Sequence, residues 1–152
     1  MKPDQSVPDF SLPATSAGTF QLSAQRGRIL VLYFYPKDST PGCTTEAGQF
    51  RDNHAAFRKL GCDVYGISRD SLKSHENFKA KLALPFELLV DAAEEACTLF
   101  GVIKLKNMYG KQVRGIERST FLIDDQGVLR REWRAVKADG HATEVLAVVK
   151  SL

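Results

Sequence analysis

The sequence predicts an α/β domain in which a mixed β-sheet is covered by helices on both faces. Residues 29–35 are apolar at every position, as in a central strand that is buried on both sides. Segments with strand and helix patterns alternate after it, and a hairpin pattern over residues 119–133 adds antiparallel strands. Because 152 residues is the length of one domain, we expect residues 1–152 to fold as a single unit.

The individual elements follow from local signals. Prolines 3, 8 and 13 indicate an extended N-terminal segment, and residues 36–42 must be a loop because they hold two prolines and a glycine. Strands are expected at residues 29–35, 64–68, 86–90, 119–123 and 128–133. Helices are expected at residues 41–59, 71–82 and 93–100, and from about residue 140 onward, the last carrying Val145, Leu146, Val149 and Leu152. Right-handed crossovers keep the first strands parallel, and this mixed sheet with one terminal helix fits a thioredoxin-like fold.

Composition and charge exclude several classes of protein. With 43% hydrophobic and 26% charged residues, the chain is neither disordered nor a disulfide scaffold. The net charge of +3 is small and spread along the chain, which gives no case for nucleic-acid binding. The longest apolar run, residues 29–35, is too short to cross a membrane. We therefore expect neither nucleic acid nor membrane as a partner.

The cysteines and histidines bear on compartment and metal binding. The first eight residues contain no apolar signal core, and the cysteines are odd in number and sparse, at positions 43, 62 and 97. Both features predict a reducing cytoplasm. There is no Cys-x-x-Cys, and the histidines at 54, 75 and 141 form no ligand spacing with each other or with the cysteines. No metal site is expected.

Cys43 is the candidate reactive residue. It follows the central strand and lies three residues inside the next predicted helix, after Thr40 as a good N-cap and Pro41 at the first helical position. Free backbone N–H groups and the helix dipole favour an ionised thiolate there, and the thiolate is the nucleophile. The alternative is a buried structural cysteine, but such a residue gains nothing from following Thr-Pro-Gly.

A reactive cysteine needs a partner that the local sequence does not specify. A Cys–His hydrolase is unsupported, because no motif ties a histidine to Cys43. Arg118 opens the apolar strand at 119–123 and could hold a thiolate, although an arginine there is by itself more often a solvated strand-end charge.

The chain resembles the peroxiredoxins of the bacterioferritin comigratory protein (PrxQ) subfamily. The matching segments run along the whole chain: residues 8–13 (PDFSLP), 35–44 (YPKDSTPGCT), 66–71 (GISRDS), 108–111 (MYGK), 115–124 (GIERSTFLID), 133–137 (WRAVK) and 140–142 (GHA). The Pro-x-x-x-Thr-x-x-Cys motif at 36–43 is highly specific. The resemblance implies a thioredoxin-like fold with an N-terminal extension, and thiol peroxidase activity toward hydrogen peroxide and organic hydroperoxides.

The resemblance also implies a role for each motif residue. Cys43 is the peroxidatic cysteine and cycles through a sulfenic acid. Thr40 bonds the thiolate and the peroxide, Pro36 shields the pocket from water, and Arg118 holds Cys43 ionised and polarises the peroxide. Glu46, one turn after Cys43, is a candidate to orient Arg118, with a solvated helix residue as the alternative.

The chain departs from the family pattern at the resolving cysteine. Many members carry it five residues after the peroxidatic one, where this chain has Gly48, and others carry it in the helix at about 71–82, which has no cysteine. Three mechanisms remain: an external thiol acts on Cys43 alone, Cys97 or Cys62 resolves it after local unwinding, or another subunit supplies the thiol. We favour the first.

Other functions and partners are weighed against this interpretation. A disulfide oxidoreductase is disfavoured by the missing Cys-x-x-Cys, and a redox sensor would oxidise at Cys43 without turnover. The expected reductant is thioredoxin, or glutaredoxin with glutathione. The subfamily resemblance suggests a monomer and implies no metal or organic cofactor.

Overall fold

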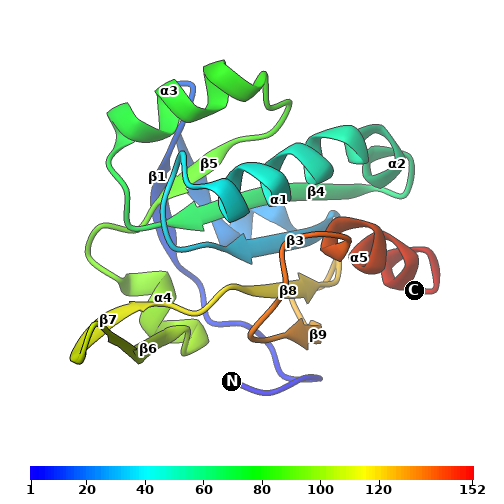
Figure 1. Ribbon diagram of the computed structural model, residues 1–152. Coiled ribbons are helices and arrows are strands. Elements are labelled where there is room, and N and C mark those ends of the chain that lie inside the picture. The colour runs from blue at the N-terminus through cyan, green and yellow to red at the C-terminus, as the bar shows by residue number, and fades with distance from the viewer.

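The computed structural model describes residues 1–152 and contains a seven-stranded mixed sheet with five α-helices (Figure 1). The sheet order is β2-β1-β5-β4-β3-β8-β9. Its strands are β1 (Ser11–Ala14), β2 (Gly18–Gln21), β3 (Ile29–Phe34), β4 (Cys62–Ser68), β5 (Leu88–Val90), β8 (Ser119–Ile123) and β9 (Leu129–Trp133). Strands β3, β4 and β5 are parallel, whereas β8 is antiparallel to β3. The α/β class and the mixed sheet predicted from the pattern are therefore confirmed.

Strand β3 separates two hydrophobic cores because its side chains alternate between the faces of the sheet. Leu30, Leu32 and Phe34 belong to one core, and Val31, Tyr33 and Tyr35 belong to the other. The second core is covered by α1 (Pro41–Asp52), α2 (His54–Lys59), α3 (Leu72–Leu82) and α5 (His141–Lys150). The first is covered by α4 (Glu95–Phe100), the 3-10 helix η1 (Leu22–Gln25) and the N-terminal segment. Helices thus lie on both faces, as predicted (Figure 1).

Three details differ from the elements expected. The helix expected over residues 41–59 is two helices, α1 and α2, divided at Asn53. The Asn53 side-chain amide donates to the Gln49 carbonyl at 2.8 Å and so competes with the helical backbone bonds. The N-terminal segment is not merely extended, because β1 and β2 pair as a hairpin at the sheet edge. Leu152 lies beyond the end of α5 and is exposed.

A second hairpin was not expected from the sequence. Strands β6 (Ile103–Met108) and β7 (Lys111–Ile116) pair antiparallel and form a separate two-stranded sheet that projects from the body of the molecule (Figure 1). Tyr109 and Gly110 both have positive φ, 52° and 77°, as a two-residue hairpin turn of type I′ requires. Its strands are mostly exposed, and the alternation of apolar and polar residues extends over only residues 103–106 (IKLK), which is a weak strand signal.

The ends of the strands determine where side chains from distant segments meet. Because β8 runs antiparallel to β3, with Ser119 opposite Phe34, the start of β8 lies at the carboxyl end of β3. Helix α1 begins at that same end. No helix has both the length and the apolar character that crossing a bilayer requires.

Candidate active site

Cys43 lies in the first turn of α1, close to the carboxyl end of β3. The helix begins at Pro41, so Cys43 is its third residue, and its side chain is almost completely buried. Backbone N–H groups of a first helical turn have no partner within the helix, and they carry the positive end of the helix dipole. The local setting expected for Cys43 is therefore present.

Arg118 connects Cys43 to the carboxylate of Glu46. One terminal nitrogen, Nη2, donates to Cys43 Sγ at 3.4 Å, and the other, Nη1, donates to Glu46 Oε1 at 2.7 Å. Arg118 immediately precedes β8, and the pairing of Ser119 with Phe34 brings it beside the start of α1. A cation therefore lies against the sulfur, in a site where the arginine side chain is only 15% exposed.

The glycine before Cys43 makes room for this guanidinium. A Cβ atom added at Gly42 would lie 3.1 Å from Arg118 Nη2, the nitrogen that contacts the sulfur. That separation is tighter than an ordinary contact, so a larger residue would displace the arginine. The Thr-Pro-Gly-Cys sequence therefore both starts the helix and admits Arg118.

Glu46 is fully buried next to Arg118 rather than being a solvated helix residue. Its Oε1 atom accepts from Arg118, whereas Oε2 has no hydrogen-bond partner. Burial raises the pKa of Glu46 to about 7, although the adjacent Arg118 charge opposes that rise. Near neutral pH this carboxyl group is therefore divided between its charged and neutral forms.

Thr40 and Pro36 belong to the loop between β3 and α1. Thr40 occupies the N-cap position of α1, but its side chain makes no capping bond, contrary to the sequence expectation. Its hydroxyl instead donates to the Lys37 carbonyl at 2.8 Å, which closes a short turn. Pro36 is half-buried at the beginning of this loop.

Cys62 lies at the opposite end of the sheet from Cys43. In the β3–β4 register Cys62 is level with Ile29, whereas the carboxyl end of β3 is level with Ile67. Five residues of strand correspond to about 16 Å, and a disulfide requires Cα atoms within about 7 Å. Burial raises the pKa of Cys62 to about 12, which disfavours the nucleophilic thiolate form.

Cys97 lies on the other face of the sheet. It belongs to the core beneath α4, whereas Cys43 belongs to the core beneath α1. Burial, with an additional contribution from Asp91, raises the pKa of Cys97. All three cysteines are free thiols.

Histidines do not contact Cys43. Its one side-chain hydrogen bond is to Arg118, while His141 bonds Thr120 at 2.8 Å and His75 bonds Asp38 at 2.7 Å. The arrangement needed for a Cys–His hydrolase is therefore absent.

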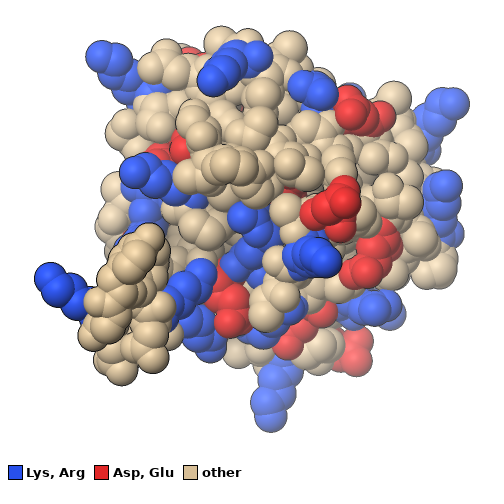
Figure 2. Space-filling model, in the orientation of Figure 1, with Lys and Arg blue, Asp and Glu red and all other residues tan.

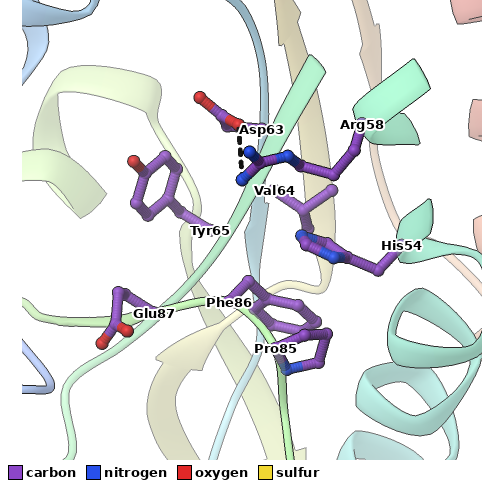
Figure 3. A pocket seen from close by; sticks show the side chains of 8 residues that line it. All are labelled: His54, Arg58, Asp63, Val64, Tyr65, Pro85, Phe86 and Glu87. Carbon is purple, nitrogen blue, oxygen red and sulfur yellow. Dashed lines mark ion pairs between the residues drawn. The ribbon is translucent and has the colours of Figure 1, made fainter. Parts of the chain in front are cut away.

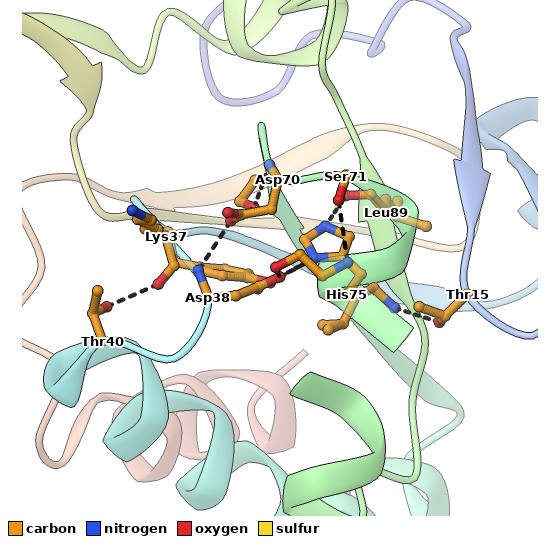
Figure 4. A network of polar contacts seen from close by, with 12 residues as sticks. Thr15, Lys37, Asp38, Thr40, Asp70, Ser71, His75 and Leu89 are labelled. Carbon is orange, nitrogen blue, oxygen red and sulfur yellow. Dashed lines mark hydrogen bonds and ion pairs between the residues drawn. The ribbon is translucent and has the colours of Figure 1, made fainter. Parts of the chain in front are cut away.

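Sequence reasoning missed a buried polar network beside the loop between β3 and α1 (Figure 4). Asp38, Asp70 and His75 place possible ligand atoms within 4.8 Å of one another. The ligand atoms of Asp38 and His75 already bond each other, and Asp70 Oδ2 accepts from the Asp38 N–H and from Ser68. The spacing of these residues along the sequence could not reveal this cluster. A signal was present for His75 alone: it precedes the apolar Phe78 by three residues, so both lie on the same, buried side of the predicted helix.

A surface pocket elsewhere is separate from this site. It has a volume of about 250 Å³ and lies between α2 and the early part of β4 (Figure 3). Asp63 and Val64 line it and are level with Leu30 and Val31 of β3, far from the strand end that leads to Cys43. Figure 2 shows Lys and Arg interspersed with Asp and Glu over one face, so no single sign of charge dominates there.

Comparison with known proteins identifies the family. Residues 3–132 match the AhpC/TSA family. The chain is 54% identical to peroxiredoxin Bcp of Xanthomonas campestris over 144 residues, covering 93% of this chain and 90% of the relative. It is 49% identical to peroxiredoxin Bcp of Bacillus subtilis over 148 residues, covering 97% and 94%.

Solved structures agree. The X. campestris bacterioferritin comigratory protein, studied for its alkyl peroxide reduction activity, matches with a TM-score of 0.90 and 51% identity, covering 93% of this chain and 90% of that one. Xylella fastidiosa PrxQ matches with a TM-score of 0.95 and 41% identity, covering 99% and 96%. These matches confirm the thioredoxin-like fold. The chain therefore belongs to the AhpC/TSA family and is a thiol peroxidase of the Bcp (PrxQ) group of peroxiredoxins.

Proposed function

We propose that residues 1–152 form one catalytic domain in which Cys43 is the peroxidatic cysteine. The observation that carries this proposal is the contact of Arg118 with Cys43 Sγ at 3.4 Å, made while the same guanidinium is paired with Glu46. A buried cation fixed against a sulfur favours the thiolate over the thiol. Neither of the other cysteines has a cation in hydrogen-bond contact with its sulfur.

The chemistry is a displacement at oxygen. The Cys43 thiolate attacks one peroxide oxygen, the O–O bond breaks, and its electron pair stays on the leaving oxygen. That oxygen takes up a proton and departs as water or an alcohol, and Cys43 becomes a sulfenic acid. Arg118 and the free N–H groups at the start of α1 stabilise the negative charge as it moves from sulfur to the leaving oxygen.

Thr40 and Pro36 position and protect the peroxide. Because the Thr40 hydroxyl donates its proton to Lys37, its oxygen lone pairs are free to accept the O–H of an incoming peroxide. Pro36 has no backbone N–H and contributes an apolar, half-buried ring at the edge of the loop. Glu46 orients the guanidinium, because it fixes one nitrogen while the other contacts sulfur.

The substrates we propose are hydrogen peroxide and organic hydroperoxides. The X. campestris relative is described as reducing alkyl peroxides. A pocket of about 480 Å³ is lined by residues that include Trp133 and Val136. The Val136 N–H donates to the backbone carbonyl of Arg118 at 2.9 Å, so this pocket lies next to the backbone of the arginine, and Trp133 and Val136 are apolar side chains that an alkyl group could contact there.

An external thiol regenerates Cys43 in this proposal. The sulfenic acid releases water when that thiol attacks its sulfur, and a second thiol then frees Cys43 from the mixed disulfide. The placement of Cys62 at the far end of the sheet and Cys97 on its other face supports a single-cysteine mechanism over internal resolution. Thioredoxin, or glutaredoxin with glutathione, would supply the thiols.

The setting we propose is a monomer in the cytoplasm. Three free, buried thiols suit a reducing compartment. The exposed apolar residues of the β6–β7 hairpin are interleaved with lysines, which disfavours a dry interface there. Light scattering across a range of concentrations tests the monomer, and a constant dimer mass would refute it.

Intact mass and thiol counting after one equivalent of hydrogen peroxide test the mechanism. Without reductant, we expect Cys43 to gain one or two oxygens while Cys62 and Cys97 remain free. The C62A/C97A variant should keep full turnover with an external thiol, and the C43S variant should lose it. Loss of two hydrogens with an internal disulfide would refute the single-cysteine mechanism, and an unreactive Cys43 would refute its assignment.

A further inference from the structure

The loop that presents Thr40 to the site depends on one buried side chain. Between Pro36 and the start of α1, Asp38 alone is fully buried, at 5% exposure. Ser39, the next residue, has a φ of +63°, a left-handed conformation that residues other than glycine rarely adopt. A loop with this strain keeps its shape only if other contacts fix it.

Those contacts converge on Asp38. Its Oδ1 accepts from the Tyr35 hydroxyl at 2.6 Å, and its Oδ2 accepts from the Ser74 hydroxyl at 2.8 Å and bonds His75 Nδ1 at 2.7 Å. Its backbone N–H donates to Asp70 Oδ2 at 2.9 Å. The loop is thereby bound to the residue that follows β3, to the β4–α3 connection and to α3 (Figure 4).

The bonds of His75 define its protonation. Its Nδ1 faces the Asp38 carboxylate, and its Nε2 lies 2.8 Å from the carbonyl oxygen of Leu89. A carbonyl oxygen accepts only, and so does an ionised carboxylate. Both oxygens of Asp38 accept hydroxyl protons, Oδ1 from Tyr35 and Oδ2 from Ser74, as the oxygens of an ionised carboxylate do, and although burial opposes it these hydrogen bonds lower the pKa of Asp38. Both ring nitrogens must then donate.

We propose that His75 is a positioning residue for peroxide reduction: as a buried imidazolium between Asp38 and the Leu89 carbonyl, it fixes the loop that carries Thr40. The Lys37–Thr40 turn encloses Asp38, and the Thr40 carbonyl accepts the N–H of Thr44 at 2.9 Å. A shift of Asp38 therefore moves both the Thr40 hydroxyl and the first turn of α1. This inference rests on the proposed role of Cys43.

Two amide substitutions separate the two bonds of His75. The side-chain amide of Asn can replace Nδ1 and keep the bond to Asp38, whereas that of Gln can replace Nε2 and keep only the bond to Leu89. Each substitution removes one buried hydrogen bond, so H75N and H75Q should be destabilised by similar amounts. We expect H75N to work within threefold of the wild-type rate and H75Q to be slower with peroxide by tenfold or more, because small misplacements at a reacting centre can cost on the order of a hundredfold.

The readout is a ratio of two rate constants for Cys43. One is for single-turnover oxidation by hydrogen peroxide, and the other is for alkylation by iodoacetamide at the same pH. Alkylation requires only an accessible thiolate, whereas peroxide reduction also requires the Thr40 geometry. H75Q should therefore lower the ratio of the peroxide rate to the iodoacetamide rate. An unchanged ratio in H75Q, or an equal fall in H75N, would overturn the proposal.

Controls separate the possible failures. V149A removes methyl groups from the same core on α5, remote from the loop, and should lower stability without changing the ratio. If H75Q does not fold, ¹H–¹⁵N spectra of the wild-type His75 ring still decide the charge, and a neutral ring would contradict the proposal. If Cys43 of the wild-type protein does not react with peroxide, the proposed function is refuted. If the wild type reacts and H75Q has the wild-type ratio of rates, only the role of His75 is refuted.

Discussion

Replacing Arg118 by Met isolates the contribution of its charge to the reaction. Met is unbranched and of comparable length, so the variant removes both hydrogen bonds while filling much of the same space. In the wild-type protein the guanidinium lies 3.4 Å from Cys43 Sγ and 2.7 Å from Glu46 Oε1. The variant therefore leaves a buried thiol without a cation and a buried carboxyl group without a partner.

The size of the effect follows from these distances. Two unit charges 3.4 Å apart interact by about 5 kcal/mol at an effective dielectric constant of 20. Pairing with Glu46 offsets roughly half of this, which leaves about 2.5 kcal/mol, or a rate reduction on the order of a hundredfold. Loss of one preorganised donor at an oxyanion reduces rates by about 10²–10³, which agrees with this value.

Stability should respond differently from rate. R118M leaves the buried Glu46 carboxyl group without its partner, and breaking a buried ion pair lowers the free energy of unfolding by about 3–5 kcal/mol. Arg118 opposes the rise in the pKa of Glu46 that burial causes, so without Arg118 Glu46 takes up a proton more readily, and this limits the loss to the lower end of that range, about 3 kcal/mol. In the R118M/E46Q double variant no buried charge is left without a partner, so most of this stability should return while the rate of reaction with hydrogen peroxide stays low.

Quenched-flow oxidation with alkylation and mass spectrometry measures the second-order rate constant at pH 7.5, and urea unfolding measures stability. We expect both R118M and R118M/E46Q to react with hydrogen peroxide about a hundredfold more slowly than the wild type. If the double variant recovered the rate together with the stability, Arg118 would be a structural residue and the electrostatic argument would be wrong.

Three further predictions concern the same region. G42A should slow peroxide reduction by about tenfold, because its Cβ displaces Arg118 Nη2 from its contact with the sulfur; an unchanged rate would refute the close contact. Burial raises the Glu46 pKa from 4.5 to about 7, so wild-type stability should fall relative to E46Q by about 3 kcal/mol as the pH rises from 4.5 to 7, and parallel urea midpoints would contradict this. Burial lowers the His141 pKa from 6.5 to about 4, so stability should fall as the pH drops through this range, and H141Q should lack the trend.

Local chemistry made part of the site predictable from the sequence. The apolar run at residues 29–35 identified the central strand, and the Thr-Pro-Gly sequence placed Cys43 in the first turn of a helix. Burial of Glu46 could also have been inferred, since Cys43, Glu46 and Phe50 are spaced three and four residues apart on one helical face. These features depend on neighbours in the chain, which sequence patterns encode directly.

Contacts between distant segments were not predictable in the same way. Arg118 is 75 residues from Cys43, and only the antiparallel register of β3 and β8 brings them together. The residue pattern alone favoured a solvated charge at that position, and the family resemblance supplied its role. His75 and Asp38 are 37 residues apart, and no motif in either segment signals their pairing.

The loop between β3 and α1 is held in place by charged side chains on both sides rather than by the backbone hydrogen bonds of a β-sheet. Asp38 and His75 hold its first half against α3, and Arg118 with Glu46 holds the start of α1. In the proposed mechanism, oxidation of Cys43 affects only the second of these contacts, because a thiolate becomes a neutral sulfenic acid and Arg118 loses the attraction to sulfur. The first turn of α1 should then open more easily while the Asp38–His75 pair keeps the loop in place. Since Cys43 is 1% exposed in this structure, the external thiol of the proposed mechanism would need such an opening to reach it.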